Sequence, residues 1–184
     1  PCVYRHDSEP SIAWRHGDDI GIVGEDELLE RVYVELSKVM ILKKRAKLGW
    51  EEGDDRSVTL LNRIISLSSR DGKQVLAYEP DPRHAELLVK LFGLGGNRTR
   101  GVSTPGEKAG DYYDETPLEG EHVKLYRRGT MRLGYVAQDV LLMQYLANKV
   151  AKHMGKPIAG GLNRLKRVAR FLKAHPRWQT VYVE

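Results

Sequence analysis

Two adjacent carboxylates stand at the sharpest turn signal of the chain, His16-Gly17-Asp18-Asp19, between the apolar runs 12–16 and 20–23. Carboxylate oxygens are hard ligands that suit Mg²⁺. With a third carboxylate from a neighbouring strand, such a pair can hold two metal ions and support phosphoryl or nucleotidyl transfer. Glycine and aspartate are also ordinary turn formers, so a simple turn is the alternative. Because neighbouring strand residues point to opposite faces, we expect Asp18 to be the principal ligand and Asp19 to support it.

Positive charge is concentrated at the C-terminal end. Residues 1–121 hold 17 Lys/Arg against 23 Asp/Glu, a net charge of −6, whereas residues 122–184 hold 13 against 2, a net charge of +11. Such asymmetry is typical of a protein with one face for a polyanion, and it makes nucleic acid the first partner to consider. A phosphate-binding face of this kind gives salt-dependent affinity.

The basic residues of the run 162–174 are spaced to share the outward face of a helix, and three arginines of the run 127–132 extend the same chemistry. A solvated helix surface is the alternative interpretation, but the near absence of acids in this part of the chain favours phosphate contacts. The predicted nucleic-acid-binding residues are Arg127, Arg128, Arg132, Arg164, Lys166, Arg167, Arg170 and Lys173.

Other kinds of site find little support in the sequence. The six histidines lack the paired spacing of zinc ligands, and the single cysteine, Cys2, excludes an internal disulfide. No apolar run approaches the roughly 20 residues of a membrane helix, and no cleavable leader is recognisable. We therefore expect an intracellular protein without a membrane partner. Because the chain begins at Pro1, we expect it to be part of something longer.

Short alternating runs predict strands in the first half of the chain. Residues 3–6, 12–16 and 20–23 indicate an antiparallel meander, and the apolar spacing within 25–38 indicates a helix. Further strands are expected at 40–48, 57–66 and 74–78, the last two joined as a hairpin by the turn Arg70-Asp71-Gly72-Lys73.

The second half of the chain shows helical periodicity. Helices are expected at 82–92, 123–138, 140–154 and 162–174, with the glycine-rich segment 95–120 as an exposed connection and hinge. The fold class is α+β: an antiparallel sheet with a helix, followed by a basic helical bundle. We expect segment boundaries at 1–79, 80–121 and 122–184.

Several segments, in one order, resemble the reverse transcriptase of copia-type LTR retrotransposons. His16-Gly17-Asp18-Asp19 looks like that family's catalytic hairpin, usually Tyr-Val-Asp-Asp. The segments Leu61-Asn62-Arg63-Ile64, Asp81 to Leu88, Thr104-Pro105-Gly106, Tyr126 to Gly129, Leu133 to Asp139 and Leu165 to Leu172 resemble later parts of such elements. The match runs nearly end to end.

The resemblance implies part of a polymerase palm in 1–79, a helix and linker in 80–121, and a thumb-like and connecting bundle in 122–184 that leads to an RNase H domain. Asp18 and Asp19 would be the catalytic, metal-binding acids of a site with two Mg²⁺ ions. Lys43 or Lys44 would lie near the incoming nucleotide, and the strand containing Asn62 would grip the primer end.

The implied activity is RNA-directed DNA polymerisation, a nucleotidyl transfer. Its partners would be an RNA/DNA template-primer, deoxynucleotide triphosphates and the rest of a polyprotein with RNase H and integrase regions. The implied location is the cytoplasm or the element's particles, with the nucleus as an alternative.

Two departures from the family pattern matter. Family members need another aspartate and the fingers upstream of the hairpin, which the 15 residues before His16 cannot supply, so we expect the isolated chain to be inactive. Asp139-Val140-Leu141 stands where the family usually has Arg-Pro-Asp. The alternatives are a non-catalytic nucleic-acid-binding module of a degenerate or domesticated element, and an α+β interaction domain without a nucleic-acid role.

Overall fold

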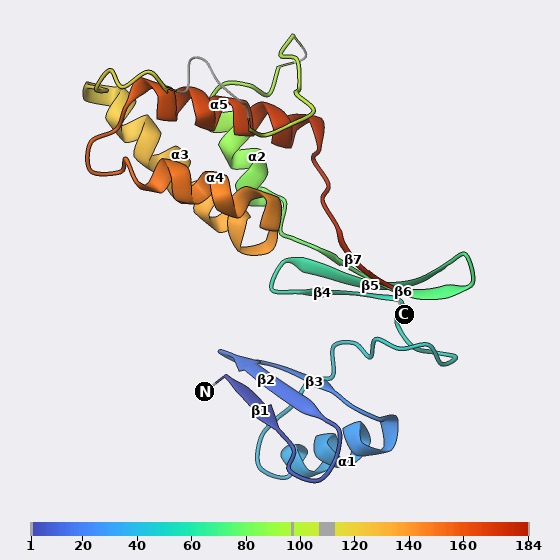
Figure 1. Ribbon diagram of the computed structural model, residues 1–184. Coiled ribbons are helices and arrows are strands. Elements are labelled where there is room, and N and C mark those ends of the chain that lie inside the picture. Colours follow the sequence, from blue (N-terminus) through green and yellow to red (C-terminus); the bar gives the residue numbers. More distant parts are fainter. Residues whose placement is uncertain (1, 97, 107–112, 184) are drawn as a thin grey trace. The chain divides into compact units, whose positions relative to one another are not determined.

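The computed structural model describes residues 2–96, 98–106 and 113–183 (Figure 1). The chain divides into two compact units, 1–47 and 48–184. Both contain helices and antiparallel strands, which confirms the α+β class. None of the helices in the described residues combines the length and the apolar character that crossing a bilayer requires.

The first unit is a three-stranded meander with one helix. The strands β1 (Val3–Arg5), β2 (Ile12–His16) and β3 (Asp19–Val23) pair in that order, as predicted. The helix α1 (Asp26–Ser37) confirms the predicted helix, and acids occupy its first turn, where the helix dipole favours them.

Close backbone approaches fix the local packing of this unit. Trp14 lies directly opposite Gly21, and a Cβ there would come within 2.3 Å of the indole Nε1 atom, so the ring lies across the glycine. At the start of α1, a Cβ on Gly24 would meet Ser11 at 3.1 Å and the buried Leu28 at 3.5 Å. Gly21 therefore makes room for the Trp14 ring, and Gly24 lets the start of α1 approach Ser11.

The strand predicted at 40–48 is wrong. Residues 41–47 form an irregular segment, with one isolated bridge between Leu48 and Asp55. Lys44 binds Glu30 at 2.6 Å and Lys47 binds Asp26 at 2.6 Å, so lysines of this segment follow the acidic side of α1. The apolar run around Ile41 is exposed, because no neighbouring strand pairs with it among the described residues.

The second unit contains a four-stranded antiparallel sheet. Its strands are β4 (Ser57–Leu60), β5 (Arg63–Arg70), β6 (Lys73–Glu79) and β7 (Thr180–Val183), in that order across the sheet. The predicted hairpin at Asp71-Gly72 is confirmed, with both residues at positive φ, the geometry of a type I′ turn.

The single strand predicted at 57–66 is wrong, because a second tight turn divides it. Leu61 and Asn62 adopt φ values of 48° and 62°, and Leu60 pairs directly with Arg63. This is also a type I′ turn, formed here without glycine. β4 and β5 are therefore two strands of one hairpin.

Four helices follow: α2 (Arg83–Leu91), α3 (Gly120–Asp139), α4 (Leu141–Ala151) and α5 (Ala159–Ala174). All four confirm predicted helices. Helix α2 contacts α3 and α5, and α3 also contacts α4, so α2 completes the expected bundle. The buried core of the bundle contains Leu88, Tyr126, Leu133, Met143, Val150, Leu165 and Val168, each 0% exposed.

Tyr126 is the largest fully buried side chain of this core. Its hydroxyl donates a hydrogen bond of 2.6 Å to the Val150 carbonyl oxygen, which satisfies the polar end of the ring. A Cβ on Gly161 would lie 2.7 Å from the Tyr126 ring, so α5 approaches α3 closely at that glycine. The packing of this part of the core therefore requires the large Tyr126 ring and a glycine at position 161, where a side chain would collide with the ring.

Charged groups join the sheet to the bundle. Asp139, the last residue of α3, accepts hydrogen bonds from Arg63 Nε at 3.1 Å and from the Tyr78 hydroxyl at 2.7 Å. Burial raises the pKa of Tyr78 to about 12, and the hydrogen bond to Asp139 is the second largest cause.

Glu79, with a side chain that is 5% exposed, accepts hydrogen bonds of 2.6 Å from Arg177 and 3.1 Å from Gln179. The bond from Arg177 lowers the pKa of the Glu79 carboxyl.

The units differ from the segment boundaries expected at 79 and 121. Strands β4, β5 and β6 belong to the second unit, together with the bundle. The reason is the return of the chain after α5, because β7 pairs with β6 from Val75 to Tyr78 (Figure 1). Sequence order alone does not reveal a strand that closes on a partner so far away in the chain.

Candidate acidic hairpin and cationic bundle surface

The acidic hairpin has a two-residue turn at Gly17-Asp18. His16 pairs directly with Asp19, and Gly17 has φ +60° while Asp18 has no positive φ, which matches a type II′ turn with glycine first. Asp18 is exposed at the tip and Asp19 is half-buried at the start of β3. The two carboxylates thus differ in position, as strand alternation predicts.

The donor set of the hairpin is compatible with Mg²⁺, because carboxylate oxygens are the ligands this ion prefers. Within the described ranges, no group of three or more His, Cys, Asp or Glu side chains is arranged to hold a metal ion.

The predicted nucleotide-vicinity residues are divided between the two units. Lys43 is exposed in the irregular segment after α1. Lys44 binds Glu30, and its Nζ lies 5.7 Å from the centroid of the Tyr33 ring. Asn62 is in the second unit, in the turn between β4 and β5, instead of inside a strand. Its side chain is exposed at a hairpin end.

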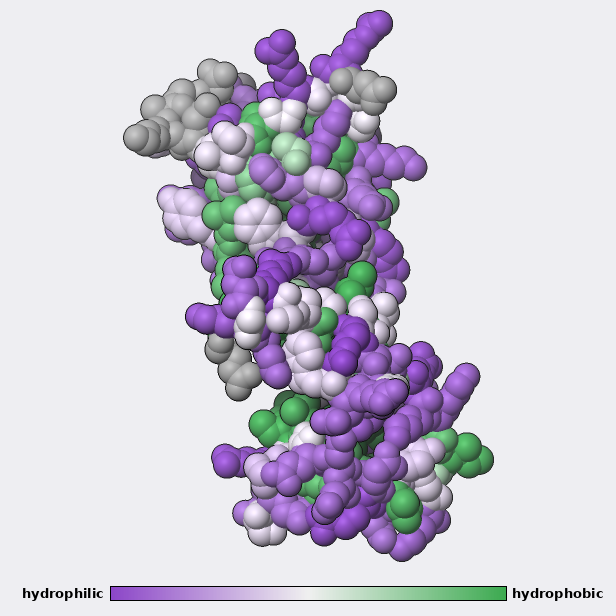
Figure 2. All heavy atoms as spheres, turned by 90° about the vertical axis from the view of Figure 1, so that its right-hand side faces the viewer, coloured by the Kyte–Doolittle hydropathy of each residue, from purple (hydrophilic) through white to green (hydrophobic). Residues whose placement is uncertain are grey.

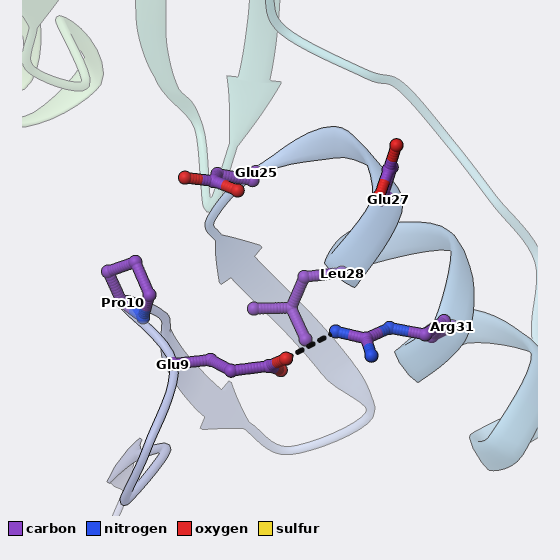
Figure 3. Close-up of a pocket in the computed structure, with 6 residues that line it drawn as sticks. All are labelled: Glu9, Pro10, Glu25, Glu27, Leu28 and Arg31. Atoms are coloured by element: carbon purple, nitrogen blue, oxygen red, sulfur yellow. Dashed lines mark hydrogen bonds and ion pairs between the residues drawn. The ribbon is translucent and has the colours of Figure 1, made fainter.

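A small pocket in the first unit has an acidic lining (Figure 3). Glu9 points toward Arg31 and accepts its 2.6 Å hydrogen bond, while Leu28 lies beside that pair. Glu25 and Glu27, at the start of α1, complete the lining with Pro10. The Glu9–Arg31 ion pair joins the turn before β2 to α1.

Two of the predicted phosphate-binding residues of α5 hold a loop. Arg167 donates to the Gly106 carbonyl at 3.1 Å and to the Thr104 hydroxyl at 3.0 Å. Lys173 donates to the carbonyls of Gly96 and Thr99, the latter at 3.1 Å. These contacts give both cations a role in holding the loop, and phosphate binding by Arg167 and Lys173 stays a prediction.

The same contacts hold part of the connection expected at 95–120, whose role as a hinge stays a prediction. The described part of this connection at 95–106 lies against α5, since a Cβ on Gly101 would come within 2.5 Å of the Ala174 Cβ atom. Pro105 is buried. Residues 107–112 of the expected hinge lie outside the described residues.

The other predicted cations are positioned in different ways. Arg127 donates to the carbonyls of Met154 at 3.1 Å and Gly155 at 3.5 Å, so it holds the end of the α4 region. Arg128 and Arg170 are exposed. Half-buried positions are occupied by Arg132, Arg164 and Lys166.

The pinned loop adds two arginines that the sequence-based prediction missed. Arg98 and Arg100 are exposed and flank Thr99, whose carbonyl is held by Lys173. Gly101 follows directly and packs on the Arg170–Ala174 end of α5. The loop thereby brings Arg98 and Arg100 to the end of α5 that carries Arg170. These three residues are called the loop–α5 cluster below.

The sequence signal that could have revealed the loop–α5 cluster is the pair of arginines in Arg98-Thr99-Arg100, within an otherwise acidic connection.

The side chains of the loop–α5 cluster form no hydrogen bond or ion pair with another described residue. Figure 2 shows one face of the molecule, on which hydrophilic residues dominate and hydrophobic ones occur in scattered groups. The described chain thus offers unpaired cations on a polar surface.

No protein-family model, curated protein or solved structure matches this chain.

Proposed function

We propose that this chain binds a nucleic-acid template-primer and forms the C-terminal palm and thumb-like part of a copia-type RNA-directed DNA polymerase. The observation that carries the proposal is the acidic hairpin, in which a two-residue turn between paired strands presents Asp18 and Asp19. The resemblance of the ordered segments suggests the reaction. The positive charge of the bundle surface suits a negatively charged partner such as nucleic acid.

In the proposed reaction, Asp18 and Asp19 hold Mg²⁺ together with an aspartate from outside this chain. Bound Mg²⁺ activates the primer 3′-hydroxyl and stabilises the leaving pyrophosphate. Asp18, exposed at the tip, would be the principal ligand, and Asp19 at the start of β3 would support it. The new bond joins the 3′ oxygen to the α-phosphorus of the nucleotide, and the bond from that phosphorus to pyrophosphate breaks.

Primer extension tests the proposal in two arms. The isolated chain with Mg²⁺ is expected to show no template-dependent extension. The chain placed in its full reading frame is expected to extend the primer, and Asp18→Asn is expected to remove that activity. Asp71→Asn is the matched control, because Asp71 also lies in a two-residue hairpin turn that accepts asparagine. Extension unaffected by Asp18→Asn contradicts the polymerase proposal.

A second candidate function is nucleic-acid binding without catalysis. The observation that favours it is the loop–α5 cluster, in which a pinned loop aligns Arg98 and Arg100 with the helix end that carries Arg170. Such a cluster can neutralise phosphates without any role for the hairpin acids. Binding then persists unchanged in Asp18→Asn.

Salt-dependent binding to a labelled RNA/DNA duplex tests the cluster. Replacing Arg98, Arg100 and Arg170 together by Ala is expected to reduce the slope of log affinity against log salt by roughly 2 to 3, about 0.9 for each lost phosphate contact. A control triple of exposed arginines, Arg5, Arg15 and Arg70, each changed to Ala, removes the same charge elsewhere. Equal slopes in both triples contradict a role for the cluster.

A further inference from the structure

An aromatic pair stands on the surface between two helices of the bundle. His84 of α2 and Tyr135 of α3 stack with ring centroids 4.5 Å apart and ring planes 14° from parallel. Tyr135 remains 49% exposed, so the pair is in part open to solvent. The His84 Nδ1 atom is buried and lacks a hydrogen-bond partner in the described residues, which leaves stacking as the contact that orients the pair.

Cations lie on the same face of α3 as Tyr135. Arg132 and Arg128 precede it by three and seven residues, the spacing that places side chains in one row of a helix. The axial distances are about 4.5 Å and 10 Å, from a rise of 1.5 Å per residue. Neither arginine forms a hydrogen bond or an ion pair with any other described residue. Met131, 55% exposed, adds an apolar surface to this row.

An exposed flat ring next to unpaired cations is the combination by which proteins bind single-stranded nucleic acids. Every base has a flat face that can stack on an aromatic ring, and the neighbouring phosphates attract cations. A buried aromatic pair that only fills a core does not present its face to water. Tyr135 keeps about half of its surface exposed while it stacks on His84.

We infer that the His84–Tyr135 pair is a stacking site for an unpaired base of single-stranded RNA or DNA, with Arg128 and Arg132 binding the phosphates beside that base. The inference rests on the proposed nucleic-acid function and extends it to a strand that is not base-paired. The site is distinct from the loop–α5 cluster, which requires only phosphates and therefore accepts duplex or single strand.

The test measures binding of a fluorescently labelled single-stranded 12-mer and of the matching duplex. Tyr135→Ala is expected to weaken single-strand binding by roughly 5- to 150-fold, the effect of losing one stacked base. Tyr135→Phe keeps the flat ring and is expected to bind within twofold of the original chain. Tyr135→Leu keeps apolar cover over His84 without a flat ring, so it separates the loss of stacking from damage to the fold.

A second readout reports stacking itself. An oligonucleotide carrying 2-aminopurine is expected to lose fluorescence on binding the original chain and Tyr135→Phe, and to keep it on binding Tyr135→Leu. Tyr4→Ala is the matched control, because Tyr4 of β1 is 48% exposed, close to the 49% of Tyr135, and lies in the other unit. It is expected to change neither readout.

The outcomes separate this inference from the proposed function. The stacking site is overturned if Tyr135→Leu and the original chain bind the single strand equally well and change the 2-aminopurine fluorescence equally. If the duplex still binds in that case, the proposed function stands. If neither oligonucleotide binds, both proposals fail. If a protein or a lipid vesicle binds at Tyr135 while the single strand does not, the stacking site is overturned as well.

Discussion

The acidic hairpin and the helical bundle are built on very different amounts of buried surface. In the described part of the first unit, Leu28 is the only buried apolar residue, joined by Ser11. The bundle of the second unit buries fifteen apolar residues in one cluster. Because buried apolar area is the main favourable contribution to folding, we expect the bundle to stabilise itself and the hairpin unit to be marginal.

The exposed residues of the hairpin unit support this contrast. Ile12 and Val23 are paired neighbours on one face of its sheet and are 49% and 70% exposed, while Tyr4 and Ile20 are 48% and 38% exposed. Both faces of the small sheet therefore leave apolar surface uncovered. The candidate metal-binding acids, Asp18 and Asp19, thus lie on the unit that we expect to be less stable. The candidate phosphate-binding cations lie on the bundle, which we expect to be more stable.

The largest expected effect is on the core of the bundle. Leu165→Ala removes a side chain that is 0% exposed and leaves a cavity, so the free energy of unfolding should fall by about 2–5 kcal/mol. Urea unfolding followed by circular dichroism measures this. The control is Leu141→Ala, at a residue 71% exposed, which should change stability by no more than about 0.5 kcal/mol. Similar losses in the two variants contradict a self-sufficient core.

The next effect concerns the connection between sheet and bundle. Asp139→Ala deprives Arg63 and Tyr78 of their shared acceptor, and bonds to a charged group contribute roughly 1.5–3 kcal/mol when well buried, less at this half-buried position. Hydrogen exchange should show faster opening of β5 and β6 with α5 still protected. Glu121→Gln, whose exposed ion pair with Lys124 is weak, serves as the control. Uniform protection of β5 and β6 in Asp139→Ala refutes the connection.

A smaller loss is expected from the buried hydroxyl of Tyr126. Tyr126→Phe removes the bond to the Val150 carbonyl and should lower the free energy of unfolding by about 1 kcal/mol, measured in the same urea experiment. Tyr145→Phe, an exposed tyrosine of α4, is the control and should have no measurable effect. Equal values for the two variants count against the importance of that hydrogen bond.

The pH dependence of the second unit should depend on Glu79. Its pKa in the folded chain lies below the ordinary value of 4.5, chiefly because of the bond from Arg177. The folded chain therefore binds this proton less readily than the unfolded chain. The resulting stability is present above pH 4.5 and is lost as pH falls through the lower folded pKa.

Urea unfolding of Glu79→Gln between pH 7 and pH 3 tests this linkage. The variant should be less stable at pH 7 and should lose less stability on acidification than the original chain. Glu52→Gln, at an exposed glutamate, is the control and should keep the original pH profile. An unchanged profile in Glu79→Gln rules out Glu79 as the source.

The smallest expected effect is on the hairpin unit. Val23→Thr replaces a residue that is 70% exposed, and surface substitutions usually change stability by no more than about 0.5 kcal/mol. The amides of β2 and β3, followed by hydrogen exchange, should keep the original rates. A loss above about 2 kcal/mol would break the comparison, because it would mean that Val23 is covered in solution.

Helices were the best-predicted part of the fold. Apolar spacing places α1 to α5 within a few residues because one-sided burial produces that spacing directly. Strand boundaries were poorer for local reasons. The turn at Leu61-Asn62 carries no glycine. The apolar residues near Ile41 suggest a strand, but no described strand pairs with them.

The candidate site was predictable only in part. The turn at Gly17-Asp18 follows from its residues, because glycine favours the positive φ that the turn requires. The contacts of Arg167 and Lys173 do not follow from the sequence. Their outward spacing on α5 cannot show that Gly106 and Gly96 accept hydrogen bonds from them. The stack of His84 on Tyr135 joins two helices and likewise has no local signal.

The pairing of β6 with β7 has a consequence for the order of folding. Glu79 and Arg177, which bind each other beside this strand pair, are separated by 98 positions in the chain. Closing so long a loop costs roughly 4 kcal/mol of chain entropy before any contact is gained. Contacts between α2 and α5 bring the two strands together, and we therefore expect the bundle to assemble first. Until then β6 keeps an open edge, the kind of surface at which incompletely folded chains associate.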